Sequence, residues 1–321
     1  MTDNICKICG NLDSNRVFKG RDMSGKKDEF EYIECAACGC LQLKSIPENL
    51  EKYYADGYYA FIKPNCPKIG KTKLVLKRMR SGYYLGDKTI MGKLMARIAP
   101  SDMDYAWYRK AGVGVDSRIL DIGSGAGDIL TNLKSHGFSN ILGIDAFIED
   151  DIHYENGLAI LKKNVYEIDG EYDFIMLHHS FEHMPDPLEI LRRLHSLLKP
   201  DRYVLIRIPV ARSYAWRKYG ANWVGLDAPR HFFLHTVDSM RILARKSGFT
   251  ITEIEYDSTP FQFWGSEQYS SDIAVNDPRS VKYGLENSIF TESDLQYFNN
   301  MTLELNEKGD GDAACFYLHK E

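Results

Sequence analysis

The chain has 321 residues, 44% of them hydrophobic, so it can bury a sizeable core in one large α/β domain plus a smaller module. Its formal net charge of −5 argues against a surface generally adapted to nucleic acid. We expect no membrane span and a cytoplasmic location, because no apolar run is long enough to cross a bilayer and the first residues lack a signal-peptide pattern.

Two closely spaced cysteine pairs lie in the first fifty residues. The motifs CKICG and CAACG leave 25 residues between the pairs. In a reducing compartment such pairs are typical of tetrahedral Zn²⁺ with no open position. We therefore predict a zinc-ribbon module over 1–50 with a structural metal; a vestigial or disulfide-forming set is the alternative. The predicted ligands are Cys6, Cys9, Cys35 and Cys38.

The charge of this module bears on its partner. Residues 1–50 contain seven Lys/Arg and eight Asp/Glu, a poor balance for following phosphates. We therefore do not expect a nucleic-acid partner and favour substrate recognition or scaffolding.

Residues 51–112 form a connector that is first aromatic and then basic, and we expect it to be helical. The stretch YYADGYYAFI brings several tyrosines together, which could pack between domains or bind an acceptor. Residues 61–86 contain seven Lys/Arg and no Asp/Glu. They could hold an anionic group such as a diphosphate, or form a solvated helix face.

From about residue 113 to the end at 321, apolar strand-like runs alternate with helical patterns. We expect strands at 118–122, 140–146, 172–180, 203–209, 250–256 and 312–320, and helices at 127–137, 185–200 and 236–249. This alternation predicts an α/β, doubly wound, mostly parallel Rossmann-like sheet with an antiparallel last strand. The aromatic stretch at about 258–312 is too long for a plain loop, so we expect a cap over the ligand edge of the sheet.

The loop DIGSGAG follows the first of these strands. Gly123 and Gly125 let a ligand approach the backbone, and the next helix directs free N–H groups at it. The third glycine comes one residue earlier than in dinucleotide dehydrogenases, which disfavours NAD. A second acid, Asp145, ends the next strand and could accept both ribose hydroxyls of an adenosine group.

This combination resembles the class I S-adenosylmethionine (SAM)-dependent methyltransferases, whose first motif has the form acid-x-G-x-G-x-G. Asp121, Gly123 and Gly125 match that motif. The resemblance implies a SAM cofactor, with Asp145 at the ribose. The alternatives are another nucleotide-binding fold, or glycines that serve only close helix–strand packing.

Histidines gather after the strand at 172–180. His179, Glu182 and His183 stand at its carboxyl end, where open α/β sheets bind ligands. Glu182 and His183 match an "EH" segment of methyltransferases of the ubiquinone-biosynthesis and sugar types. We predict His179 near the cofactor, His183 as general base and Glu182 as its partner. A structural histidine is the alternative; a metal site from His178, His179 and His183 is less favoured.

A second polar cluster, NWVGLDAPRHFFLHT, follows the strand at 203–209. It resembles a segment near the acceptor in bacterial small-molecule and polysaccharide-pathway methyltransferases. The resemblance suggests His231 as a second acid/base group and substrate contacts from Trp223 and Arg230. Alternatively, Arg230 and His231 pair with carboxylates to hold the loop.

An amino-terminal zinc module before such a domain also resembles deoxysugar C-methyltransferases, in which it helps to bind the nucleotide-sugar. That resemblance implies acceptor contacts from Tyr54, Tyr58 and Tyr59. The additional carboxyl-terminal domain of that group has no counterpart here, which argues against C-methylation.

We therefore expect methyl transfer from SAM to a hydroxyl, or a carbon, of a sugar, nucleotide-sugar or polysaccharide-pathway intermediate. The alternatives are an RNA or protein methyltransferase guided by the zinc ribbon, and an inactive zinc-dependent interaction protein.

Overall fold

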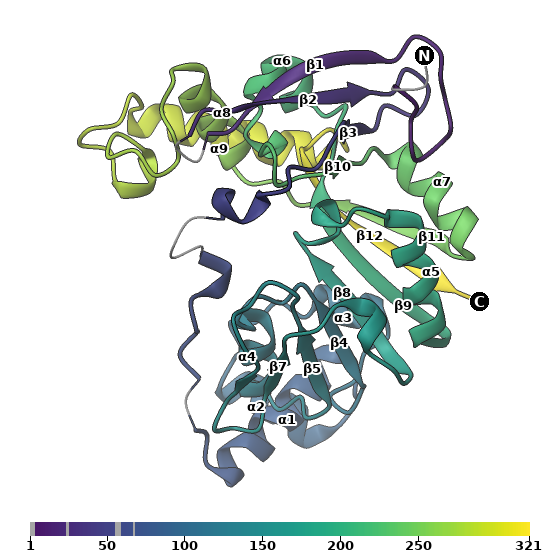
Figure 1. The fold of residues 1–321 in the computed structure, drawn as a ribbon. Helices are drawn as coiled ribbons and strands as arrows, with labels where there is room; N and C mark the ends of the chain where they lie inside the picture. The colour runs from purple at the N-terminus through teal and green to yellow at the C-terminus, as the bar shows by residue number, and fades with distance from the viewer. Residues whose placement is uncertain (1–3, 24–25, 55–58, 67) are drawn as a thin grey trace.

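The computed structural model describes residues 4–23, 26–54, 59–66 and 68–321. Within these residues a large sheet is flanked by helices, and a smaller sheet lies beyond one end of it (Figure 1). The larger sheet consists, in spatial order, of β11 (Thr250–Tyr256), β12 (Ala313–Lys320), β9 (Leu198–Pro209), β8 (Tyr172–His178), β4 (Ile119–Ile122), β5 (Ile141–Ile144), β7 (Ala159–Leu161) and β6 (Ile152–His153).

The pairing of these strands confirms the predicted fold class. Strands β7, β5, β4, β8 and β9 are parallel neighbours, whereas β12 runs antiparallel to both β9 and β11. All six strands expected from the apolar runs are present. The short strands β6 and β7 were not predicted from the sequence, since each has only two or three residues.

Helices cover both faces of the sheet, as predicted. The α-helices are α1 (Lys71–Leu85), α2 (Ile90–Ile98), α3 (Ala106–Lys110), α4 (Asp128–Ser135), α5 (Pro187–Leu197), α6 (Tyr214–Tyr219), α7 (Val237–Ser247), α8 (Phe261–Ser270) and α9 (Glu292–Glu307). Thr236 caps α7 as expected, because its side chain accepts a hydrogen bond from the Ser239 N–H.

Alternation along the strands divides the core in two. Ile119 faces a cluster that contains side chains of α3 and α4, whereas its neighbour Leu120 faces a cluster that contains side chains of α5 and α7. The second cluster continues without a break into the amino-terminal module and includes Tyr32 and Cys35. The large sheet and the module therefore share one apolar core.

The smaller sheet joins the first predicted region, 1–50, to the third, 113–321. Its strands are β1 (Arg16–Arg21), β2 (Glu29–Glu34), β3 (Leu41–Leu43) and β10 (Phe233–Leu234), in that spatial order. Strand β10 belongs to the segment that follows β9, so the polar cluster at 222–236 is fixed to the cysteine module by β3–β10 pairing. The domain limits at 50, 112 and 258–312 remain predictions.

Candidate active site

A cavity of about 820 Å³ opens at the carboxyl ends of β4, β5 and β8. Its wall comes from the glycine loop at 121–128, the end of β5 at 144–147, residues 163–166 and the end of β8 at 178–186. Parallel strands present their carboxyl ends at one sheet edge, and helix α4 starts there. We call this space the donor cavity.

Two glycines of the loop have no room for a side chain. Gly123 and Gly125 adopt φ values of +73° and +55°. A Cβ on Gly125 would lie 2.2 Å from the Ala60 carbonyl oxygen. The Ala126 N–H donates to the same oxygen at 2.7 Å, so the short helix η2 (Tyr59–Phe61) lies directly on the loop. The loop is therefore a tight backbone cradle, closed on one side by the connector.

Two carboxylates lie at the ends of neighbouring strands in the donor cavity. Asp145 accepts hydrogen bonds from the N–H groups of Gly125 and Phe147, at 2.9 and 2.8 Å, which fixes its orientation. Asp121 is 2% exposed, and burial, followed by the charge of Asp145, raises its pKa to about 8. A cationic ligand group beside Asp121 would reverse this shift.

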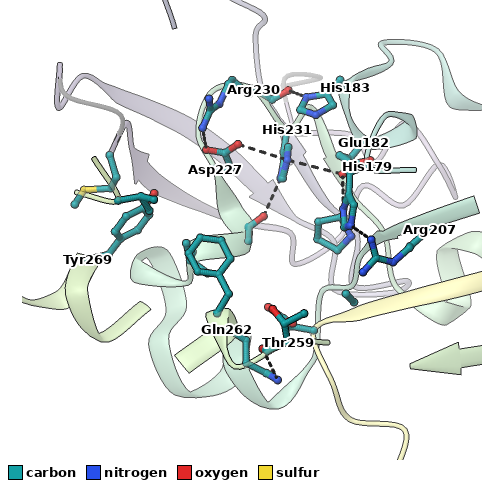
Figure 2. A pocket seen from close by; sticks show the side chains of 18 of the residues that line it. His179, Glu182, His183, Arg207, Asp227, Arg230, His231, Thr259, Gln262 and Tyr269 are labelled. Carbon is teal, nitrogen blue, oxygen red and sulfur yellow. Dashed lines mark hydrogen bonds and ion pairs between the residues drawn. The ribbon is translucent and has the colours of Figure 1, made fainter. Parts of the chain in front are cut away.

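A second cavity of about 630 Å³, which we call the acceptor cavity, adjoins the first (Figure 2). Ile62, His179, His183 and Arg207 line both cavities. Most of the remaining wall combines Met23 of the cysteine module, the segment 224–231, and residues 257–282 including α8. The two cavities thus meet at the end of β8.

A buried carboxylate lies at this junction. Glu182 is fully buried, and neither of its oxygens has a hydrogen-bond partner among the described residues. Burial by itself raises the pKa of Glu182, but the nearby imidazoles of His179, His183 and His231 outweigh it and hold the pKa at about 2. Glu182 is therefore an anion at neutral pH.

The hydrogen bonds of the surrounding histidines define their tautomers. The Arg207 guanidinium donates to His179 Nε2 at 2.7 Å, so the proton of His179 is on Nδ1, 3.6 Å from Glu182. His183 and His231 each direct Nδ1 at a backbone carbonyl, at 2.8 Å in both cases. Their Nε2 atoms are therefore free to accept a proton.

The two free imidazoles differ in environment. Burial, only partly offset by Asp227, lowers the pKa of His231 to about 4, which makes it a neutral group and a weak base. His183 is partly exposed and lines both cavities. Its ring centroid lies 4.8 Å from the ring centroid of His231. Ligand atoms of Glu182, His183 and His231 lie within 4.8 Å of one another, so this group could also hold a cation.

Comparison with known proteins agrees with this arrangement. A family profile described as a methyltransferase domain matches residues 90–254, slightly more than half of the chain. The chain belongs to this methyltransferase family. The glycine cradle and the carboxylate pair lie inside the matched region, and the enzyme is SAM-dependent.

Curated relatives of this methyltransferase are named ubiquinone biosynthesis O-methyltransferases. The protein from Yersinia enterocolitica is 26% identical over 151 residues, which is 43% of this chain and 62% of the relative. The protein from Pseudomonas aeruginosa is 28% identical over 156 residues, 43% of this chain and 66% of the relative. The match thus spans less than two thirds of either relative.

Among solved structures, the cyclopropane synthase MmaA2 from Mycobacterium tuberculosis superposes with a TM-score of 0.43 and 17% identity. That superposition covers 78% of this chain and 95% of the synthase.

The donor cavity of the methyltransferase fits SAM in its chemistry. The backbone cradle leaves space where side chains would block an approaching ligand, and the carboxylates of Asp145 and Asp121 line this space. Asp145 would have lone pairs for ribose hydroxyls, and Asp121 would stabilise a positive group. Asn164 and Val165 line the same cavity.

The other predicted site residues fall in different places. Tyr54 lines the donor cavity, with its hydroxyl 3.4 Å from His183 Nδ1 and its ring stacked on Phe147. Arg230 lines the acceptor cavity and pairs with Asp227 at 2.5 Å. Tyr58 lies outside the described residues, and only the backbone of Tyr59 is described, in η2.

Trp223 packs against the segment 224–231, which forms part of the wall of the acceptor cavity. It is fully buried, and its indole N–H donates to Asp312 at 2.8 Å. The ring packs under Gly225, where a Cβ would lie 2.4 Å from it, and the Gly225 carbonyl orients His231. Trp223 therefore lines neither cavity, in contrast to the predicted substrate contact, and instead supports the segment that carries His231.

The four predicted metal ligands converge. The sulfur atoms of Cys6, Cys9, Cys35 and Cys38 lie within 4.8 Å of one another. The Cys6–Cys38 and Cys9–Cys35 separations are 3.6 and 3.5 Å. Four thiolates at tetrahedral Zn²⁺ lie about 3.8 Å apart, given Zn–S bonds of about 2.3 Å. The cluster fits a zinc module, in which the metal would crosslink the two knuckles.

Several residues at the site were not predicted from the sequence. Arg207 orients His179 and also pairs with Asp257; a charged residue within the apolar strand 203–209 was the available signal. Gln262 and Met23 line the acceptor cavity, and Ala60 covers the glycine loop. Gln262 and Met23 come from segments without a recognisable motif, whereas Ala60 lies within the aromatic stretch YYADGYYAFI, in which only the tyrosines were singled out.

Proposed function

We propose that the enzyme transfers a methyl group from SAM to a hydroxyl of a small, hydroxyl-rich acceptor such as a sugar or nucleotide-sugar. In this proposal Asp145 binds the ribose, Gly123 and Gly125 present backbone groups, and Asp121 with His179 faces the amino-acid end of the donor. When bound, SAM supplies a methyl group already activated by its sulfonium.

The observation that carries the proposal is the position of His183 between the two cavities. Its Nδ1–H is held by the Arg230 carbonyl, so Nε2 can take the hydroxyl proton of an acceptor. The oxygen then forms its bond to the methyl carbon while the carbon–sulfur bond breaks. Glu182 stabilises the resulting imidazolium without being protonated itself.

Unpaired hydrogen-bond acceptors support a hydroxyl-rich substrate. Within the described residues, both oxygens of Glu182, Asp257 Oδ1 and Gln262 Oε1 lack a hydrogen-bond partner, and all three residues line the acceptor cavity. The His179 and His231 imidazoles lie 3.6 and 3.9 Å from Glu182 Oε1, beyond hydrogen-bond distance. Buried acceptors without donors are costly. Sugar hydroxyls would supply several donors at once. Tyr54, Arg230 and His231 are further contacts in this proposal.

A second candidate acceptor is an aromatic hydroxyl. An apolar cluster of Met23, Val224 and Tyr269, with Phe261 and Val275, forms one wall of the cavity. The relatives named for ubiquinone biosynthesis are O-methyltransferases, which supports transfer to oxygen in either case.

The test is product analysis by mass spectrometry after incubation with SAM. The acceptors compared are nucleotide-sugars, free sugars, catechol-type phenols, RNA and protein. A mass increase of one methyl group on a sugar compound supports the proposal, and one on the phenols supports the second candidate. Methylation of RNA or protein alone, or donor binding without turnover on any acceptor, would overturn both.

A further inference from the structure

Helices α1 and α2 carry large apolar side chains on the outside of the molecule. The exposed ones are Val75, Leu76 and Met79 on α1, and Ile90, Met91, Leu94 and Ile98 on α2. Ile90 is 89% exposed and Ile98 66%. Both helices lie at the end of the molecule opposite to β1 and β2 (Figure 1). We call these seven residues the apolar patch.

Helical periodicity places the patch on outward faces. On α1, Val75, Leu76 and Met79 lie within about 100° of one another around the helix axis, and the buried Ser81 lies on the opposite side. On α2, Gly92 faces α1, since a Cβ there would lie 2.6 Å from the Met79 carbonyl oxygen. Ile90, Leu94 and Ile98 are spaced by four residues and lie on the side away from Gly92.

The patch is surrounded by positive charge. Residues 71–98 contain eight Lys/Arg and one acidic residue, in a chain whose net charge is −5. In the part of the chain that the structure describes, the following six form no ion pair: Lys71, Lys73, Lys77, Lys88, Lys93 and Arg97. Burial, and then Arg80 and Lys73, lower the pKa of Lys77, and the charge of Asp102 offsets this only in part.

Apolar side chains with cations beside them on short helices match one kind of partner surface. A protein interior would tolerate the apolar groups but not six uncompensated cations. A second copy of the chain would bring the same positive charge and repel it. The headgroup region of an anionic bilayer accepts both, because acyl chains receive the apolar groups while phosphates attract Lys and Arg.

We propose that α1 and α2 dock the enzyme on the surface of a membrane that contains anionic phospholipid. The helices lie flat in the headgroup region and do not span it; none of the described helices is long and apolar enough to cross a bilayer. This inference is independent of the acceptor proposed above.

The experiment is co-sedimentation of the full chain with vesicles of phosphatidylcholine alone or mixed with phosphatidylglycerol. We expect binding to the mixed vesicles only, and its loss at high salt. Ile90→Ser combined with Ile98→Ser should weaken partitioning by at least tenfold. Lys73→Gln and Lys93→Gln should each weaken it by about fivefold.

Matched controls separate the patch from general surface effects. Leu303→Ser changes a leucine that is 58% exposed on α9, and Arg245→Gln removes an exposed cation on α7; neither should alter vesicle binding. Unchanged binding by the patch variants, or equal binding to uncharged vesicles, would overturn the proposal. So would a dimer that dissociates on Ile90→Ser, because the patch would then be a contact between copies.

Discussion

The donor and acceptor cavities are built in different ways. The donor cavity draws mainly on loops that follow consecutive parallel strands, so most of its lining lies within residues 121–186. The acceptor cavity combines the cysteine module, the 224–231 segment and the residues around α8. We therefore expect the compact donor half to keep its affinity for SAM when the acceptor half is disturbed, since the acceptor half depends on contacts between distant parts of the chain.

The strongest test of this contrast is removal of the metal cluster. Cys38→Ser should abolish zinc binding, measured by elemental analysis as about one ion per chain in the wild type. The metal contributes on the order of 10 kcal/mol to such modules, so β3 should lose its place beside β10 and turnover should be lost. Affinity for S-adenosylhomocysteine, measured by calorimetry, should remain.

Cys66→Ser is the matched control, because Cys66 lies outside the cluster. If Cys38→Ser loses affinity for S-adenosylhomocysteine as well as turnover, the donor and acceptor halves are not separable.

His183→Ala addresses the junction of the cavities. Removal of a general base should lower turnover by about 10²- to 10⁴-fold with donor affinity unchanged. The measurement is steady-state turnover on the acceptor found by product analysis, beside calorimetry. His153→Ala, an exposed histidine on β6, is the control. An undiminished rate would remove His183 from the proposed mechanism.

Asp145→Ala should weaken donor binding, which His183→Ala is expected to leave unchanged. It leaves the N–H groups of Gly125 and Phe147 without their acceptor and removes the proposed ribose contact. Donor affinity should fall by roughly 10- to 100-fold in calorimetry. Asp150→Ala, on the exposed side of the same loop, should bind normally. Normal binding by Asp145→Ala would contradict the ribose assignment.

The smallest effect concerns Asp121 in the absence of donor. Its folded pKa of about 8 lies above the ordinary 3.8, so the neutral form suits the fold better than the anion. The associated stability is complete below about pH 4 and is lost as the pH rises toward 8. Asp121→Asn should therefore melt higher than the wild type at pH 8, by roughly 2–4 °C per kcal/mol regained.

The two melting temperatures should converge as the pH falls below 3.8, where Asp121 becomes protonated in both folded and unfolded wild type. A constant difference across the pH range would contradict the assignment of this shift to Asp121.

The sequence predicted the two halves to different extents, for a physical reason. Asp121, Gly123, Gly125 and Asp145 could be placed because strand ends in a parallel sheet meet at one edge. The acceptor half could not be assembled in the same way, since register across β3 and β10 depends on long-range pairing. The predicted histidines at 179, 183 and 231 do gather, but the contact of Arg207 with His179 and the position of Gln262 in the acceptor cavity are visible only in the folded chain.

The pairing of β3 with β10 also has a consequence for biosynthesis. About 190 residues separate the two strands, so at the usual elongation rate β10 leaves the ribosome roughly 10–40 s after β3. Throughout that interval the edge of β3 in the nascent amino-terminal segment is unpaired, and an exposed strand edge favours aggregation. A metal held by the four thiolates would keep this segment folded until its partner strand is synthesised.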